Sequence, residues 1–220
     1  MKKKLHIAVQ KSGRLHDESL KLLNDCGISI DNGKDQLKAV ASNFPMEIFY
    51  LRNGDIPQYL RDGVVDIAII GENQLVEKGD DISIKEKLGF SKCRVSIAIP
   101  KENTYKGIES LTGKKIATSY PNTVKGFLAE KGIDAELHII TGSVEIAPNI
   151  GLSDAVCDIV SSGSTLFKNN LKEVEVLFKS ESVLAASSHD GGVPTGIHNF
   201  KSADIYNFAH SLLQRVLINL

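Results

Sequence analysis

Short apolar runs rich in valine and isoleucine alternate with helical stretches along this chain, and this alternation constrains its fold more than any other feature. Strands that alternate with helices are typical of α/β proteins built around parallel sheets. We therefore predict an α/β fold with largely parallel sheets. The predicted strands are residues 5–9, 46–51, 65–70, 94–99, 116–119, 137–140, 158–160 and 183–186, and the predicted helices begin after residues 14, 55, 121, 165 and 204.

Several helix boundaries are visible in the sequence. Asp55 is placed to cap a short helix that carries Pro57 in its first turn. Gly27 and Gly132 follow the last apolar residues of two other helices, where glycine often ends a helix.

The strands fall into two series, which predicts two lobes, and 220 residues are enough to give each lobe its own core. A short internal echo supports this division. Asp66 precedes Gly71 by the same spacing as Asp158 precedes Gly163, and each aspartate is placed to open a strand that runs into a glycine loop. Open α/β sheets bind ligands at such strand ends, so we expect the ligand between the lobes.

Charge and composition exclude several classes of protein. The 26 Lys and Arg residues against 27 Asp and Glu leave a net charge of −1, too balanced for a protein that neutralises many nucleic-acid phosphates. No apolar run reaches membrane-spanning length, and the run at residues 5–9 is too short for a signal peptide, so we expect a cytoplasmic protein without membrane or nucleic-acid partners. The three cysteines and six histidines show no ligand spacing, so we expect neither a disulfide framework nor a metal held by the protein.

The most informative segment is residues 158–166, where a strand runs into Ser-Ser-Gly-Ser-Thr and then a predicted helix. Such a loop can offer a phosphate successive N–H groups, hydroxyls and a helix N-terminus, although a plain hydroxyl-rich turn would have the same sequence. Two flanking carboxylates could accept hydrogen bonds from sugar hydroxyls, which favours a site for a phosphorylated ribose. The candidate binding residues are Glu145, Asp158, Ser161, Ser162, Gly163, Ser164 and Thr165.

Three cations are predicted at strand ends of the first lobe. Lys11 and Arg14 surround Gly13 in the loop after the first strand, and Arg52 follows the strand at residues 46–51. An arginine can bind a phosphate through two parallel hydrogen bonds. Solvated surface charge would explain Lys11 and Arg14, and a surface salt bridge would explain Arg52. Three cations at the strand ends of one lobe, however, favour a polyphosphate ligand.

These motifs resemble, in the same order, those of the ATP phosphoribosyltransferases, the first enzymes of histidine biosynthesis. The matching segments are residues 11–15, 51–55 with Pro57, 121–123, 142–148 and 158–166. The pair Gly-Ser-Val-Glu-Ile-Ala-Pro and Asp-Ile-Val-Ser-Ser-Gly-Ser-Thr-Leu is highly specific, so the chain is identified as a member of this family. The resemblance implies two lobes like those of type II periplasmic binding proteins, with residues 1–92 and 184–220 in lobe I, residues 93–183 in lobe II, and the active site in the cleft between them.

The resemblance also implies the reaction: 5-phosphoribosyl moves from phosphoribosyl pyrophosphate to N1 of ATP, giving 1-(5-phosphoribosyl)-ATP and pyrophosphate. Because the nucleophile is a ring nitrogen, the rate of the reaction must come from aligning N1 with C1′ of the ribose and from neutralising the leaving group. Mg²⁺ carried by the pyrophosphate would help to neutralise it. The 158–165 segment would hold the 5-phosphate, with Glu145 near the ribose. The implied catalytic residues are Lys11, Arg14 and Arg52, and the substrate-binding set also includes Gly13 and Gly71.

Two features depart from the family pattern. Asn73 stands where many relatives have an aspartate, and residues 189–207 match poorly. Long members continue into a histidine-binding regulatory domain, whereas this sequence stops at Leu220. We expect one of two forms. The chain is either a short form that needs a separate regulatory subunit resembling histidyl-tRNA synthetase, or a catalytic core without the C-terminal regulatory domain. In either case we expect a homo-oligomer.

Two other functions stay open. One is a two-lobed small-anion binding or sensing protein without turnover, because a fold alone does not specify activity. The other is a catalytically weak subunit that acts by assembling with others, through the apolar helical face predicted at residues 205–217. The three cations and the lack of an export signal favour the enzyme.

Overall fold

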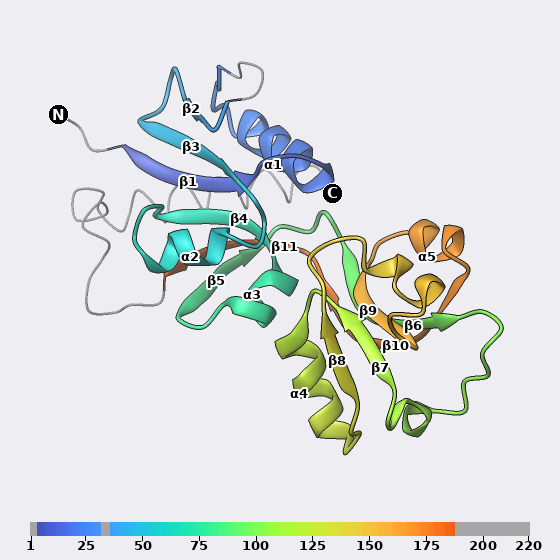
Figure 1. Cartoon of the computed structure of the whole chain (residues 1–220). Coiled ribbons are helices and arrows are strands. Elements are labelled where there is room, and N and C mark those ends of the chain that lie inside the picture. The colour runs from blue at the N-terminus through green and yellow to red at the C-terminus, as the bar shows by residue number, and fades with distance from the viewer. Residues whose placement is uncertain (1–3, 32–35, 188–220) are drawn as a thin grey trace. The chain divides into compact units, whose positions relative to one another are not determined.

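The computed structural model describes residues 4–31 and 36–187, which form two compact units (Figure 1). The first unit contains the described residues up to Ser91 and those from Glu181 onward. The second unit is Lys92–Ser180. The chain therefore passes from the first unit to the second and back again. The apolar face predicted at residues 205–217 lies outside the described residues.

The first unit is built on a six-stranded sheet with the order β2-β3-β1-β4-β11-β5. Three neighbouring strands are parallel, and the others are antiparallel to their partners. The parallel strands are β1 (Leu5–Gln10), β3 (Met46–Leu51) and β4 (Ile67–Gly71), and the antiparallel ones are β2 (Lys38–Val40), β5 (Ile82–Lys87) and β11 (Ser182–Ser187).

Helices cover both faces of this sheet, as the alternation of side chains along buried strands requires. On one face, α1 (Arg14–Asp25) buries Leu22 and Leu23 in a cluster with the β1 side chains of odd number. On the other face, α2 (Ile56–Arg61) buries Leu60 in a cluster with side chains of β4. The carboxyl ends of the three parallel strands are thereby held at one edge of the sheet.

The second unit has a five-stranded sheet with the order β10-β6-β9-β7-β8. The strands β7, β8 and β9 are parallel, whereas β6 is antiparallel to β9 and β10 is antiparallel to β6. The bounds are Cys93–Pro100 for β6, Lys115–Thr118 for β7, Glu136–Ile139 for β8, Ala155–Val160 for β9 and Leu171–Ser180 for β10.

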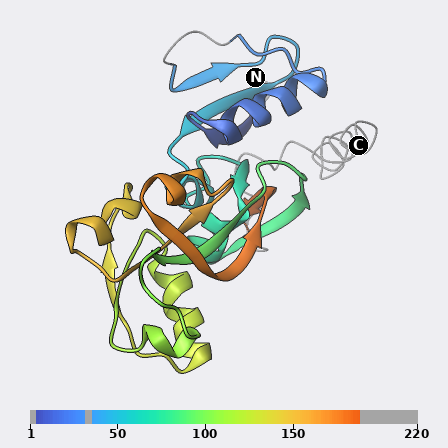
Figure 2. The same ribbon diagram turned by 90° about the vertical axis from the view of Figure 1, so that its right-hand side faces the viewer.

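This second sheet is also covered on both faces. One face packs against α4 (Pro121–Lys131) and the 3-10 turn η1 (Ile108–Leu111). The other packs against the 3-10 turn η2 (Val144–Ile146) and the five-residue helix α5 (Ser164–Lys168), with a further turn, η3 (Pro148–Ile150), beside η2. Figure 2 shows the same elements after a quarter turn. The loop between β9 and α5 is therefore anchored at both ends by buried structure.

Every predicted strand is present, with small differences at the ends, but the prediction of largely parallel sheets is wrong. Each sheet is mixed, because the predicted strands β6 and β11 run antiparallel to β9 and β4. The strands β2, β5 and β10, which were not predicted, are antiparallel to their neighbours as well. All three lie at sheet edges, where a strand is exposed and tolerates charged residues. Their sequences consequently lack the continuous apolar runs that identify buried strands.

The predicted helix ends are only partly correct. Gly132 ends α4 in the left-handed conformation, with φ of 67°, as expected for a glycine at that position. Asp55 directly precedes α2, but its side chain makes no capping hydrogen bond. The helix expected from residue 166 begins two residues earlier, at Ser164.

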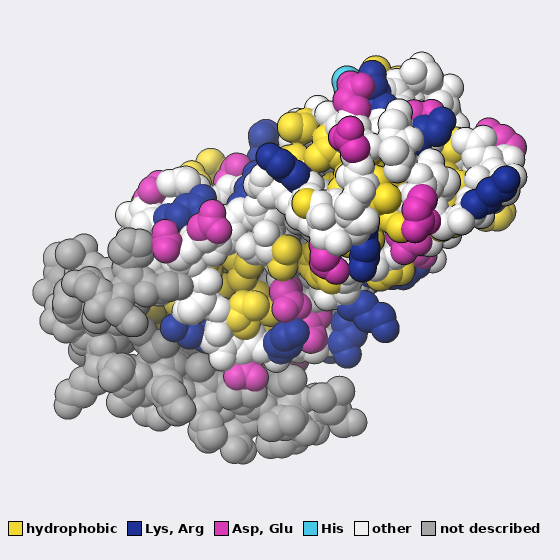
Figure 3. All heavy atoms as spheres, turned by 90° about the horizontal axis from the view of Figure 1, so that it is seen from below, with side chains coloured by type: hydrophobic (Ala, Val, Ile, Leu, Met, Phe, Trp, Pro, Cys, Tyr) yellow, Lys and Arg dark blue, Asp and Glu magenta, His cyan; other side chains and the backbone are white. Residues whose placement is uncertain are grey.

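Charged side chains of both signs are interspersed with apolar ones on the face of the molecule shown in Figure 3, which carries no extended basic stripe. Among the residues that the structure describes, no helix has the length and apolar character needed to span a bilayer.

Candidate functional site

One cavity of the second unit collects the predicted phosphate-binding residues. Its volume is about 230 Å³, and it opens beside the carboxyl end of β9. Strand β9, the loop after it and η2 all contribute side chains. The predicted residues that line it are Glu145, Asp158, Ser161, Ser162, Gly163, Ser164 and Thr165, so the structure brings together all seven members of this predicted set.

The loop itself is shaped to present hydrogen-bond donors. Gly163 has φ of 80° and ψ of 1°, a left-handed conformation that glycine adopts without strain. The Ser162 and Ser164 hydroxyl oxygens lie 3.1 Å apart, and the Ser164 N–H donates to Ser162 Oγ at 3.4 Å. Within the described residues, the N–H groups of Ser162 and Gly163 have no acceptor. Because α5 has only five residues, the donors that this loop could offer an anion are its own N–H and hydroxyl groups.

The pKa of Asp158 depends on its surroundings in the cavity. Burial raises the pKa of Asp158 above its ordinary value, and the negative charge of Glu145 raises it further. Two donors act in the opposite sense, since Asp158 Oδ1 accepts from the Ile159 N–H at 2.8 Å and from Ser119 Oγ at 3.2 Å. Asp158 is thus held in one orientation, as a residue that accepts hydrogen bonds from a ligand must be.

The predicted echo is correct for the strands but not for the aspartates. Strands β4 and β9 each lie between one parallel and one antiparallel neighbour, but Asp158 does not open its strand. Asp66 precedes β4 and accepts a hydrogen bond from the His6 N–H at 2.7 Å, so it joins two neighbouring strands. Asp158 instead lies inside β9 and lines the cavity. The equal spacing to the following glycine therefore does not reflect equal roles.

The predicted cations of the first unit lie at the carboxyl edge of its parallel strands. Lys11 follows β1 and donates its N–H to the Leu51 carbonyl at 2.7 Å, which places it beside Arg52 at the end of β3. Gly13, with φ of 88°, makes the turn into α1, and Arg14 is the first residue of that helix. The side chains of Lys11, Arg14 and Arg52 are exposed, so this edge of the unit presents three cations.

Gly71 ends β4 at the same edge, but its surroundings indicate a packing role. A Cβ at this position would lie 2.4 Å from Asn73 Oδ1 in α3 (Glu72–Lys78), so only glycine fits beside that amide. Asn73 itself is 2% exposed. Its side chain is therefore enclosed in the fold and does not face solvent at the strand ends.

Two residues in or beside this cavity, Ser96 and Ser119, were not predicted from the sequence. Ser96 lines the cavity from β6, directly opposite Asp158 in the antiparallel pairing with β9. Ser119 follows β7 and donates to Asp158. Ser119 could have been found from its place at a predicted strand end, whereas Ser96 could not, because nothing in the sequence shows which strands pair.

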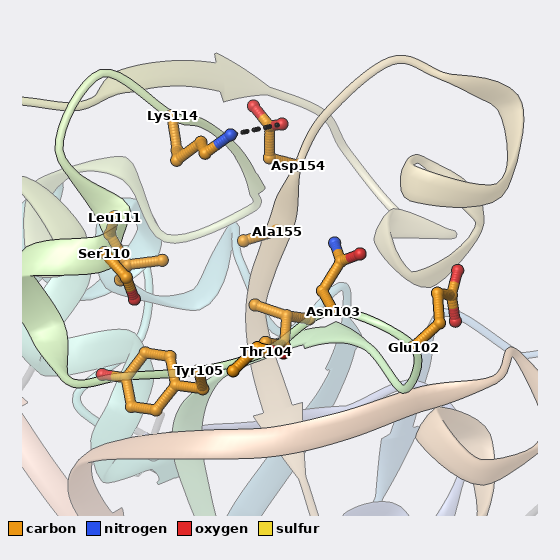
Figure 4. A pocket seen from close by; sticks show the side chains of 10 residues that line it. Glu102, Asn103, Thr104, Tyr105, Ser110, Leu111, Lys114, Asp154 and Ala155 are labelled. Atoms are coloured by element: carbon orange, nitrogen blue, oxygen red, sulfur yellow. Dashed lines mark hydrogen bonds and ion pairs between the residues drawn. The ribbon is translucent and has the colours of Figure 1, made fainter.

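A second cavity of about 350 Å³ lies at the opposite end of β9 (Figure 4). Asp154 and Ala155 line it where β9 begins, and Lys114 Nζ lies 3.5 Å from Asp154 Oδ1 across it. None of the predicted site residues lines this cavity. The two cavities are therefore separate features of the second unit.

Comparison with known sequences identifies close relatives. The family profile described as HisG, ATP phosphoribosyltransferase, matches residues 52–201. The chain is 57% identical over 182 residues to the ATP phosphoribosyltransferase of Cytophaga hutchinsonii, and 54% identical over 185 residues to that of Parabacteroides distasonis. These matches cover 83% and 84% of this chain but only 64% and 65% of the two relatives, so the chain spans somewhat less than two thirds of their length.

Solved structures agree on the fold. The HisG:HisZ ATP phosphoribosyl transferase complex of Thermotoga maritima contains a chain that superposes with a TM-score of 0.78 at 28% identity, over 96% of this chain and 98% of that one. The arginine-bound form of truncated ArgBP from the same organism superposes with a TM-score of 0.59 at 14% identity, over 97% and 96% of the two chains. The predicted likeness to type II periplasmic binding proteins is thus confirmed. The profile match and the identity to the two relatives show that this chain belongs to the ATP phosphoribosyltransferase family.

Proposed function

We propose that this chain transfers the 5-phosphoribosyl group of phosphoribosyl pyrophosphate to N1 of ATP, the first step of histidine biosynthesis, in the cytoplasm. The observation that carries the proposal is the cavity in which the donor-rich loop at residues 161–165 meets two carboxylates, Glu145 and Asp158. The loop N–H and hydroxyl groups suit a phosphate monoester, and carboxylates that accept hydrogen bonds suit ribose hydroxyls. A phosphorylated ribose presents both kinds of group.

The chemistry requires little of the protein beyond position and charge. The N1 lone pair of adenine forms a bond to C1′ of the ribose while the bond from C1′ to the pyrophosphate oxygen breaks, and pyrophosphate leaves with that electron pair. Alignment of N1 with C1′ and stabilisation of the leaving group then supply the rate. No activated side-chain nucleophile is needed, which agrees with a cavity lined by hydrogen-bond donors and carboxylates.

The cations of the first unit suit the leaving group and the ATP phosphates. Lys11 and Arg52 follow neighbouring parallel strands, and Arg14 opens α1 next to them. Arginine side chains can grip phosphate oxygens in a bidentate manner, and lysine contributes a compact charge. In this proposal, these three residues stabilise the charge that develops on pyrophosphate.

Magnesium enters the proposal as an ion carried by the pyrophosphate, where it would neutralise charge on the leaving group. In the part of the chain that the structure describes, no three His, Cys, Asp or Glu side chains are grouped closely enough to hold a metal. In this proposal, Lys11, Arg14 and Arg52 bind the pyrophosphate that carries the ion.

We further propose that the chain works in an assembly with copies of itself or with a regulatory subunit. The support is the HisG:HisZ complex of Thermotoga maritima, because the match to our chain covers 98% of a chain in that complex. A subunit resembling histidyl-tRNA synthetase is the partner that the family resemblance implies. Size determination of the purified chain, alone and mixed with such a subunit, tests this proposal, and a chain that stays monomeric in both samples would contradict it.

The reaction is tested by incubating the purified full chain with ATP, phosphoribosyl pyrophosphate and Mg²⁺ while product is removed. The ultraviolet change of N1-substituted adenine reports the product, and a parallel sample contains histidine. We expect product only when both substrates are present, and an Asp158→Asn variant should form less of it. Tight binding of phosphoribosyl pyrophosphate without turnover, even with the regulatory subunit added, would instead favour a small-anion binding protein, and no binding at all would refute the proposal.

A further inference from the structure

A bidentate ion pair lies beside the phosphate-binding loop and takes no direct part in the proposed chemistry. Arg94 of β6 donates from Nε to Glu173 Oε1 and from Nη2 to Glu173 Oε2 of β10, both at 2.5 Å. The two side chains are 30% and 25% exposed, so the pair is shielded more than an ordinary surface pair. Paired, charge-assisted hydrogen bonds of this kind fix the guanidinium plane.

The remaining nitrogen of the guanidinium reaches the loop. Arg94 Nη1 donates to the carbonyl oxygen of Ser161 at 3.2 Å, and Ser161 is the first residue of the loop. One planar side chain therefore holds Glu173 with two nitrogens and the loop backbone with the third. A lysine, with a single ammonium on a flexible stem, cannot reproduce this fork.

Strand register explains why these groups lie on the same face of the sheet. Arg94 is opposite Val160, the residue before the loop, and Glu173 is opposite Ala98. Directly opposed residues of antiparallel strands share a face, and so do alternate residues of one strand. Arg94 and Glu173 therefore lie on the face of the sheet that also carries Ser96 and Asp158, the face on which the cavity opens.

Holding the Ser161 carbonyl also orients the next N–H group. The described residues contain no cis peptide bond, so the Ser161 oxygen and the Ser162 hydrogen point to opposite sides of one planar peptide. With its oxygen held by Arg94, this peptide turns the Ser162 N–H away from the ion pair. That N–H is one of the two loop donors without an acceptor in the described residues.

We propose that Arg94 and Glu173 are positioning residues that set the orientation of the Ser161–Ser162 peptide and thereby preorganise the loop for the phosphate of a phosphoribosyl ligand. This inference rests on the proposed function, because it concerns the same ligand. Glu173 acts through Arg94, and Arg94 acts through the loop backbone. Without the pair the loop can still form, but its donors are no longer held in place before the ligand binds.

The test measures binding of ribose 5-phosphate to the full chain by titration calorimetry, together with the melting temperature. We expect Arg94→Lys to weaken ribose 5-phosphate about tenfold, the equivalent of one charge-assisted hydrogen bond, and to leave ATP binding unchanged. Glu173→Gln should weaken it less, since Arg94 keeps its contact with Ser161. Lys114→Met is the matched control, because it removes the ion pair with Asp154 at the other end of β9 in the same unit and should leave ribose 5-phosphate binding unchanged (Figure 4).

A double variant separates positioning from stability. Replacing a shielded ion pair by two apolar residues often leaves a fold as stable as before, so Arg94→Met combined with Glu173→Met should melt near the wild type. The double variant also lacks the donor to Ser161, so it should bind ribose 5-phosphate more weakly than the wild type, as Arg94→Lys does. Wild-type binding by the double variant would overturn the inference, and so would an equal loss in the Lys114→Met control.

The two proposals fail in different ways. If the wild-type chain binds ribose 5-phosphate and the variants weaken it, but no N1-substituted product ever forms, the proposed reaction is wrong and the positioning role stands. If product forms and the variants bind ribose 5-phosphate as the wild type does, the positioning role is wrong and the reaction stands. A wild-type chain that binds no ribose 5-phosphate would overturn the positioning role, whatever the outcome of the activity assay.

Discussion

Replacing Gly163 by alanine isolates the energetic cost of the backbone conformation on which the donor-rich loop at residues 161–165 depends. Gly163 has φ of 80°, and a Cβ built on it meets no atom within 4 Å. Alanine therefore fits without a clash, and its only penalty in the free protein is the left-handed conformation. That penalty is about 1–2 kcal/mol, so we expect the free energy of unfolding to fall by this amount.

Gly126 offers a matched control in the same unit. It lies in the exposed part of α4, has no positive φ, and a Cβ there also meets no atom within 4 Å. Alanine is favoured over glycine inside a helix by about 0.5–1 kcal/mol, so Gly126→Ala should stabilise the chain. The same chemical change, with the same empty surroundings, should thus have opposite signs at the two positions, and the variants should differ by about 1.5–3 kcal/mol.

The assay is urea unfolding of the full chain, followed by far-ultraviolet circular dichroism and analysed by linear extrapolation. An asparagine at position 163 provides a further check, because its side chain tolerates the left-handed region and should recover part of the loss. A Gly163→Ala variant as stable as the wild type would show that the loop relaxes out of this conformation at no cost. Stabilisation by both alanine substitutions would refute the reasoning entirely.

Three further predictions concern the site. Burial raises the pKa of Asp158, so ionising this side chain lowers the stability of the fold above the unfolded-state pKa of about 3.9. Asp158→Asn should therefore raise the melting temperature at pH 7. This gain should vanish as the pH falls to about 3.9. Ser119→Ala removes a donor that lowers this pKa, and should move the acid limb of kcat/KM for phosphoribosyl pyrophosphate to higher pH. Arg52→Ala, at an exposed position, should lower kcat about a hundredfold without changing the melting temperature. Arg61→Ala is the control: it loses a donor to the Lys78 carbonyl, so it should lower the melting temperature and leave kcat unchanged.

The central strands, and the grouping of residues 161–165 with Glu145 and Asp158, could be predicted because their signals are local. A strand such as β4 is buried on both faces, so it appears as an uninterrupted apolar run. The residues at 161–165 are contiguous, and Glu145 and Asp158 lie close by in the chain. The order of side chains along a short segment was enough to propose a ligand with a phosphate and a sugar.

The prediction that Asp158 opens a strand as Asp66 does was wrong, because spacing alone does not say where a strand begins. Asp66 lies just outside β4, whereas Asp158 lies within β9, and the two carboxylates have different partners. The edge strands β5 and β10 were missed for a related reason. Their exposed positions accept charges, so the apolar pattern that marks a strand is absent.

By itself, the sequence determined the α/β class, the two series of strands, and the loop whose hydroxyls, glycine and neighbouring carboxylates belong together. Only the tertiary structure decided that Arg94 and Glu173, 79 residues apart, meet beside that loop, and that Ser96 lines its cavity. These contacts depend on the strand order β10-β6-β9 and on the register between the strands. Local patterns encode which residues form strands, but strand pairing follows from the packing of the whole unit, because burial is shared among segments that are distant along the chain.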